Sequence, residues 1–252
     1  MPRIIAVHSF RGGTGKSNLT ANLAALITCQ GKRVAVIDTD LQSPGIHILF
    51  GLHGEEIDAS LNDFLWGRRP IHETAIDVTQ TLPGCPEGRL FLVPSSIKSD
   101  EIARILREGC DARMLTSGFR RLIQALDLDY LILDTHPGLN EETLLSLAIA
   151  HTLLIITRPD QQDFEGTGVT VEVASELSVP RTLMLVNKVP AIFDPVEVTA
   201  QVREAFGRPV AATIPHDDEL MALGSAGLFA LHRPNHPIAR SLGQVVAQLL
   251  ED

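Results

Sequence analysis

One short segment near the N-terminus constrains the fold of this 252-residue chain more than any other. The segment reads His8-Ser9-Phe10-Arg11-Gly12-Gly13-Thr14-Gly15-Lys16-Ser17-Asn18. An apolar run at residues 4–7 precedes it, and apolar residues at helical spacing follow it from Leu19. This order of strand, glycine-rich loop and helix is typical of a phosphate-binding loop. The glycines let backbone N–H groups turn toward an anion, and the helix N-terminus adds a partial positive charge.

The motif assigns roles to the residues of this loop. Lys16 can reach the β- and γ-phosphates of a nucleotide, and the Ser17 hydroxyl can ligate Mg²⁺. The remaining nucleotide-binding residues expected in the loop are Gly12, Gly13, Thr14, Gly15 and Asn18. A glycine-rich turn without a ligand is the alternative, but strand, glycines, Lys-Ser and helix all occur in the order that the motif demands.

The loop departs from the strict Gly-x-x-x-x-Gly-Lys-Ser/Thr pattern, because Phe10 stands where that pattern begins with glycine. It resembles the deviant phosphate-binding loops of the MinD/ParA family of ATPases, which read Lys-Gly-Gly-x-Gly-Lys-Thr/Ser. In that family the first lysine reaches across a dimer to the nucleotide of the partner. Arg11 holds this place here. The resemblance therefore implies a catalytic role for Arg11, with the positive charge kept and its shape changed.

Two later strands end in aspartates. The apolar run at residues 33–38 ends in Asp38, with Asp40 two positions on, and Tyr130-Leu-Ile-Leu ends in Asp134. Carboxylates at these ends face the crevice where open α/β sheets bind ligands. Asp134 resembles a Walker B aspartate, which holds Mg²⁺. The MinD/ParA resemblance implies that Asp38 supports the magnesium shell and that Asp40 orients the attacking water. Capping of the next segment is the alternative for this pair.

Two loops resemble the switch segments of the same family. They are residues 41–45, after Asp40, and residues 135–138, after Asp134. His136 departs from the commonest family pattern. We interpret it as a solvent-exposed loop histidine, with phosphate sensing as the alternative.

The resemblance also implies a base-binding site. In MinD/ParA-like proteins an asparagine at the place of Asn187 contacts the base, and a side-chain amide can both donate to and accept from an adenine edge. Related GTPases usually carry an aspartate two positions after the lysine that follows this asparagine, where this chain has Pro190, so adenine is favoured. The segment Pro215-His216-Asp217 resembles the family loop that wraps the base.

A further loop, residues 158–163, lies near the dimer interface in the resembling family. The resemblance makes Asp160 and Gln161 interface candidates. The alternative is a helix entry capped by Asp163, with the helix running from residue 164 to residue 177.

About seven apolar strands alternate with helices along the chain. The strands are expected at residues 4–7, 33–38, 89–94, 130–134, 152–157, 181–188 and 209–215. This alternation predicts an α/β fold, a doubly wound and mainly parallel sheet with helices on both faces, as in a P-loop NTPase. A chain of this length can bury one large core, so we expect residues 1–252 to form a single domain.

Composition narrows the classes of partner. The formal charge of −10 disfavours non-specific DNA as a partner without excluding a local basic patch. The helix expected at residues 238–250 lacks the basic polar face of a membrane-surface helix, so we expect no autonomous membrane binding. The start of the chain lacks a signal peptide's architecture and no apolar run is long enough to span a bilayer, which predicts a cytoplasmic protein.

The positions of the cysteines argue against a zinc site or a cluster site. Cys29, Cys85 and Cys110 are scattered, with no Cys-x-x-Cys pair, so the sequence suggests neither a zinc site nor a cluster site. We expect all three to be buried, reduced thiols.

The family resemblance implies a weak Mg-dependent ATPase with ATP and Mg²⁺ as cofactors. It would be a homodimer when ATP-bound, respond to an unidentified protein partner or activator, and act as a spatial switch that positions a division site, chromosome, plasmid or protein assembly. A small-molecule ligase of the dethiobiotin synthetase type and a non-hydrolysing nucleotide-binding scaffold stay open. A bacterial tyrosine kinase is disfavoured because Tyr130 is the one tyrosine, and an iron–sulfur ATPase is disfavoured because paired cysteines are absent.

Overall fold

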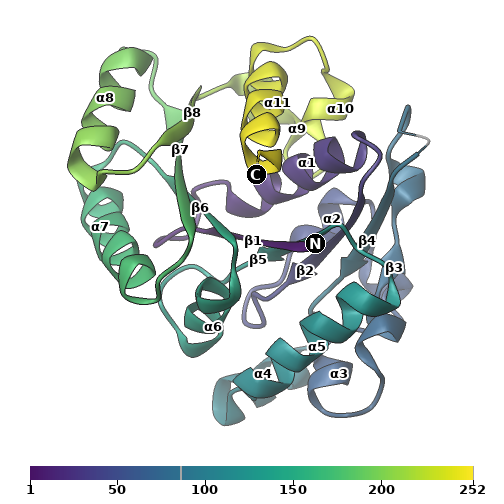
Figure 1. Cartoon of the computed structure of the whole chain (residues 1–252). Helices are drawn as coiled ribbons and strands as arrows, with labels where there is room; N and C mark the ends of the chain where they lie inside the picture. The colour runs from purple at the N-terminus through teal and green to yellow at the C-terminus, as the bar shows by residue number, and fades with distance from the viewer. Residues whose placement is uncertain (86, 252) are drawn as a thin grey trace.

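The computed structural model describes residues 1–85 and 87–251, and its eight strands form one sheet (Figure 1). The strands are β1 (Arg3–His8), β2 (Arg33–Asp38), β3 (Ile76–Asp77), β4 (Arg89–Val93), β5 (Tyr130–Asp134), β6 (Thr152–Thr157), β7 (Arg181–Val189) and β8 (Val210–Pro215). They lie in the order β3-β4-β2-β5-β1-β6-β7-β8. All neighbouring pairs are parallel except β3 with β4.

The predicted α/β fold, a doubly wound and mainly parallel sheet, is confirmed. Each of the seven expected apolar strands is present, and β3 adds a short antiparallel edge. β3 is only two residues long, too short to show as an apolar run in the sequence.

Helices cover both faces of this sheet (Figure 1). They are α1 (Lys16–Thr28), α2 (Ile46–Leu49), α3 (Leu61–Leu65), α4 (Ser99–Glu108), α5 (Ala112–Ala125), α6 (Glu141–Ile149), α7 (Gln161–Glu176), α8 (Pro195–Phe206), α9 (Asp218–Leu223), α10 (Phe229–His232) and α11 (Pro237–Leu250). The helix expected from residue 164 begins three residues earlier. The side chain of Asp160 caps it by accepting the Asp163 N–H at 3.0 Å, so the alternative of Asp163 as the cap is wrong.

Alternate residues of each strand pack into different cores. Ile5 and Val7 of β1 face the core formed with α1, α2, α10 and α11, whereas Ile4 and Ala6 face the opposite side. That opposite side is divided between a core with α3, α4 and α5 and a core with α6, α7 and α8. Because both faces are covered, the strands are apolar throughout instead of alternating.

The C-terminal helix α11 packs within the first of these cores. Its apolar stripe is buried and lies against α1 and β8. Among the described residues, no helix combines the length and apolar content needed to cross a bilayer.

Two of the cysteines contradict the expectation of reduced thiols. Cys29, at the end of α1, forms a disulfide with Cys85, which lies 56 residues away in sequence. The Thr28 carbonyl lies so close to Gly88 that a side chain at this position would clash with it. The loop before β4 therefore packs against the last turn of α1. Because this contact joins segments that are far apart in sequence, the spacing of the cysteines did not indicate it. Cys110 is a free thiol.

Replacing Cys29 with serine should therefore lower the free energy of unfolding by about 3 to 4 kcal/mol, because the disulfide closes a long loop in the unfolded chain. Urea denaturation of the oxidised proteins measures the change, and Cys110→Ser is the matched control with little expected effect. Titration of three free thiols in the denatured, unreduced wild-type protein would contradict the pairing.

Candidate functional site

The glycine-rich loop joins the carboxyl end of β1 to the N-terminus of α1. Gly13 and Gly15 adopt positive φ angles of 78° and 91°, which favour glycine. At Gly15 a Cβ would also stand 2.6 Å from Asn187 Nδ2, so a side chain here would displace the asparagine. The loop and Asn187 at β7 are therefore packed against each other.

The side chain of Lys16 turns back toward the end of β5. Its Nζ donates to Asp134 Oδ1 at 2.7 Å, and both side chains are buried. Thr20 Oγ1 donates to the same carboxylate oxygen at 3.1 Å. Ser17 Oγ lies 3.4 Å from the same ammonium.

Asp38 and Asp134 lie side by side because β2 and β5 are neighbours and the register pairs these two residues. Burial and then the charge of Asp134 raise the pKa of Asp38 well above its usual value, against the opposing effect of Lys16. Two buried carboxylates therefore lie side by side, with the Lys16 ammonium paired to Asp134 and its charge also acting on Asp38. With the Ser17 hydroxyl, this oxygen donor set fits Mg²⁺.

The Asp38 carboxylate also organises the loop that follows it. Its oxygens accept the N–H groups of Asp40 at 3.0 Å and Gly45 at 3.2 Å. The capping role considered as an alternative is thus present in Asp38, alongside its place beside Asp134.

Asp40 faces His136 across the two switch-like loops. The distance between Asp40 Oδ1 and His136 Nδ1 is 2.7 Å, and the His136 side chain is only 22% exposed, so it is not the solvent-exposed histidine that we expected. Burial tends to raise the pKa of Asp40, but the hydrogen bond and charge of His136, the Ser43 N–H and Lys16 together lower it below its usual value. Asp40 is therefore ionised at neutral pH.

His8, the last residue of β1, was not predicted as a site residue and is fully buried. Its Nδ1 is 2.8 Å from Thr135 Oγ1, which itself donates to the Val7 carbonyl, so Nδ1 carries the proton. Burial, followed by the charges of Lys16 and His136, lowers the pKa of His8 to about 3. The imidazole is neutral at physiological pH and adds no charge to the phosphate site.

A pocket of about 150 Å³ opens beside the loop. Its walls are formed by Gly15, Asn18, Leu19, Asn187, Lys188, Pro215, His216, Asp217, Leu220, Met221 and Gly224. The structure therefore brings together the expected base-binding residues of β7, the end of β8 and the segment after it with Gly15 of the loop and Asn18 in the first turn of α1. Gly12, Gly13 and Thr14 lie outside this wall, in the loop itself.

In the side-chain amide of Asn187, the nitrogen makes a hydrogen bond and the oxygen makes none with the described residues. Its Nδ2 donates to the Thr14 carbonyl at 2.8 Å, which fixes the orientation of the amide. Its Oδ1 is enclosed and accepts no hydrogen bond from the described residues. A buried acceptor of this kind fits a ligand that presents an N–H donor.

Arg11 lies against its own subunit. Its guanidinium donates to Gln162 Oε1, and its Nε is 3.8 Å from Asp163 Oδ1, while the side chain stays 43% exposed. Asp163 is buried and also accepts from Arg158 Nε at 2.7 Å. The two interface candidates lie at the same helix start, with Asp160 3.2 Å from Arg158 and Gln161 exposed.

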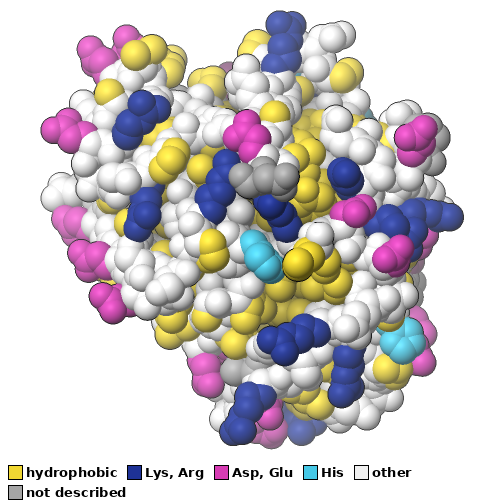
Figure 2. All heavy atoms as spheres, in the orientation of Figure 1, with side chains coloured by type: hydrophobic (Ala, Val, Ile, Leu, Met, Phe, Trp, Pro, Cys, Tyr) yellow, Lys and Arg dark blue, Asp and Glu magenta, His cyan; other side chains and the backbone are white. Residues whose placement is uncertain are grey.

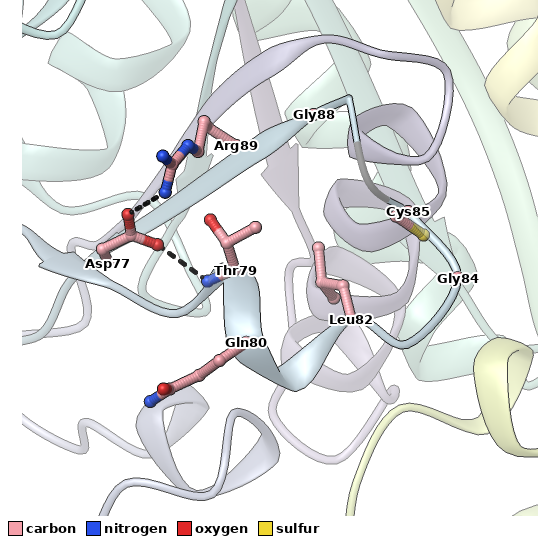
Figure 3. A pocket seen from close by; sticks show the side chains of 8 residues that line it. All are labelled: Asp77, Thr79, Gln80, Leu82, Gly84, Cys85, Gly88 and Arg89. Carbon is pink, nitrogen blue, oxygen red and sulfur yellow. Dashed lines mark hydrogen bonds and ion pairs between the residues drawn. The ribbon is translucent and has the colours of Figure 1, made fainter.

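A second, wider hollow of about 690 Å³ lies at the opposite edge of the sheet (Figure 3). Its wall includes Arg89 at the amino end of β4, and the side chain of Arg89 pairs with Asp77 at 3.0 Å. Cys85 also lines it, next to Gly84. None of the expected nucleotide-binding residues lines this hollow.

Comparisons with known proteins show the family and the fold of this chain. A family model described as ParA, NUBPL iron-transfer P-loop NTPase, matches residues 1–250. An ATP-binding protein of Methanocaldococcus jannaschii is 26% identical over 247 residues, which cover 98% of this chain and 87% of that protein. The cytosolic Fe-S cluster assembly factor cfd1 of Emericella nidulans is 32% identical over 173 residues, 60% of this chain and 49% of that factor, so the match spans about half of its length.

Solved structures share the fold. The septum site-determining protein MinD of Pyrococcus horikoshii, complexed with Mg-ADP, superposes with a TM-score of 0.81 at 18% identity and covers 100% of this chain and 97% of its own. At this identity the likeness concerns the fold. Since the family model spans almost the whole chain, this chain belongs to the ParA/NUBPL iron-transfer family of P-loop NTPases.

Proposed function

We propose that this chain is a weak, Mg-dependent ATPase that dimerises when ATP-bound and acts as a spatial switch for a cellular cargo. One observation carries the proposal. Four side chains converge at the carboxyl ends of parallel strands, and the pocket that contains Asn187 opens beside them. They are Lys16, Ser17, Asp38 and Asp134.

In the proposed reaction, water attacks the γ-phosphorus and the bond from this phosphorus to the β–γ bridging oxygen breaks. The protons of the water pass to the released phosphate, and ADP and phosphate leave. Asp40 accepts a hydrogen bond from the attacking water and orients it. Lys16 leaves Asp134 to meet the phosphates. Ser17, Asp38 and Asp134 would hold Mg²⁺, which supplies positive charge against the phosphate oxygens.

We assign Arg11 a role in a dimer. Its guanidinium is partly exposed and makes its two contacts through Gln162 and Asp163 of α7. An arginine fork can donate two parallel hydrogen bonds to phosphate oxygens, whereas its Nε lies 3.8 Å from the buried Asp163 carboxylate, beyond hydrogen-bond distance. ATP on a facing subunit would draw Arg11 away from α7 to act as an arginine finger in trans.

Asn187 Oδ1, which accepts no hydrogen bond from the described residues, favours adenine over guanine as the base. The exocyclic amino group of adenine can donate to this oxygen, whereas guanine has a carbonyl oxygen at that place. Asn187→Leu should weaken ATP binding about tenfold and reduce the preference for ATP over GTP. Calorimetric titration of both nucleotides measures this, with Asn235→Leu at an exposed site as the control. Equal affinities for ATP and GTP in the wild-type protein would contradict the assignment.

Concentration dependence tests the proposed dimer. ATP hydrolysis per subunit should rise with protein concentration, because the complete site requires two copies. A ligase of the dethiobiotin synthetase type or a non-hydrolysing scaffold would show no such rise. Hydrolysis per subunit that is constant over a thousandfold range of concentration, with a monomer throughout, would refute the dimeric switch.

Iron–sulfur cluster assembly or transfer is a second candidate, favoured by the family description and by the similarity to cfd1. Within residues 1–85 and 87–251, no group of three or more Cys, His, Asp or Glu could hold a metal ion. Cys110 lies 3.5 Å from Glu142, and burial and that carboxylate raise the pKa of its thiol to about 12. A protonated thiol is a poor ligand, which disfavours Cys110 as a cluster ligand. Anaerobic reconstitution followed by visible absorption tests whether the chain alone binds one.

The distribution of charge on the surface favours some classes of binding partner over others. On the face shown in Figure 2, basic side chains are interspersed with acidic ones, and acidic side chains gather over α7 and α8. Together with the net charge of −10, this supports a protein partner over bare DNA or an anionic bilayer.

A further inference from the structure

The contact between Asp40 and His136 follows from the register of the sheet. Asp38 and Asp134 are paired across β2 and β5, and each is the last residue of its strand. Two residues further on, Asp40, directly before the first switch-like loop, therefore faces His136 in the second. Their side chains meet through Asp40 Oδ1 and His136 Nδ1 at 2.7 Å.

The backbone around His136 is held from both sides. Thr135 donates through its N–H and its hydroxyl to the Val7 carbonyl of β1. The Gly138 N–H donates to the Ser9 carbonyl in the phosphate-binding loop, and Thr143 Oγ1 donates to the His136 carbonyl at 3.2 Å. The imidazole thus extends from a fixed backbone toward a carboxylate on the neighbouring loop.

Both donors to Asp40 bind the same oxygen. Oδ1 accepts the Ser43 N–H at 2.8 Å as well as His136 Nδ1. Oδ2 accepts no hydrogen bond from the described residues, and it is not among the enclosed polar atoms that lack partners. Because an ionised carboxylate can only accept, His136 must carry its proton on Nδ1. One oxygen of this carboxylate therefore accepts two hydrogen bonds, and the other accepts none from the described residues.

We propose that His136 is a positioning residue, whose Nδ1–H holds Asp40 so that Oδ2 faces the attacking water. This inference rests on the proposed ATPase function and adds to it the residue that couples the two switch-like loops. His136 acts through Asp40 and is not itself a contact of the nucleotide. Its loss should therefore lower kcat and leave the affinity for ATP nearly unchanged.

Three substitutions at His136 separate positioning from simple packing. Asparagine places its Nδ2 donor near the position of histidine Nδ1, glutamine places its donor near Nε2 instead, and alanine has none. His136→Ala and His136→Gln should lower kcat about tenfold to a hundredfold, with KM within about threefold of wild type. His136→Asn should restore kcat to within about threefold. His72→Ala, at an exposed histidine, is the matched control.

A second readout does not depend on hydrolysis. Amide hydrogen exchange of residues 41–45 in the nucleotide-free protein should become faster in His136→Ala and stay close to wild type in His136→Asn. Equal loss of kcat in all three variants, a large rise in KM, or unchanged kcat and exchange in His136→Ala would each overturn the positioning role. Failure of the proposed function looks different, because the wild-type protein itself would then show no Asp40-dependent hydrolysis while the His136-dependent protection of the loop persisted.

Discussion

Lys16→Ala should lower both the affinity for ATP and kcat/KM at least about a hundredfold. The Lys16 ammonium is buried at the end of the glycine-rich loop, and it is the positive charge closest to Asp134 at 2.7 Å. Without it the phosphates lose their main cationic contact within the subunit. The carboxylates of Asp38 and Asp134 would then repel the nucleotide as well as each other. Isothermal titration with ATP and a phosphate-release assay measure the two effects.

The control for this substitution is Lys32→Ala, beyond the far end of α1, which should change neither quantity. Because Lys16→Ala leaves two buried carboxylates without their partner, its folding must be checked by circular dichroism. Lys16→Met, with a side chain of similar volume, provides a second variant. Unchanged affinity and hydrolysis in a folded variant would show that this loop does not bind the nucleotide.

Asp40→Ala should separate binding from hydrolysis. The carboxylate lies on the loop after β2 and holds the Ser43 N–H and His136, and it is not part of the oxygen set formed by Asp38 and Asp134. Its removal should therefore leave ATP affinity within about threefold of wild type and lower turnover at least about a hundredfold. The variant should accumulate as an ATP-bound dimer, which sedimentation velocity can detect.

Asp77→Asn is the matched control for Asp40→Ala. It removes a carboxylate that pairs with Arg89 at the opposite edge of the sheet, beside the hollow of Figure 3, and should not affect turnover. Hydrolysis at the wild-type rate in Asp40→Ala would show that another group orients the water.

The sheet and the ends of its strands could be predicted because they depend on local patterns. Strands covered on both faces need continuous apolar runs, and functional side chains follow the point where such a run stops. Asp38 and Asp134 are examples, as is Asn187, which lies within the last residues of β7. Parallel pairing then places all three at one edge of the sheet.

The features that could not be predicted depend on contacts between distant segments. Gly166 of α7 has no room for a side chain because the ring of Phe10 lies against it, and nothing near either residue signals this pairing. The contact nonetheless gives a reason for Phe10 in the glycine-rich loop. The link between His136 and Asp40 has the same character, because the register of β2 against β5 creates it.

Mixing two inactive variants tests most directly whether ATP joins two copies of this chain. Arg11→Ala keeps Asp40, and Asp40→Ala keeps Arg11. If the arginine acts in trans, each mixed dimer contains one site with both groups, and an equimolar mixture should recover about a quarter of wild-type activity by random pairing. Recovery at that level is the result that our account predicts. A mixture as inactive as its components, or an Arg11→Ala protein that hydrolyses ATP normally by itself, would contradict it.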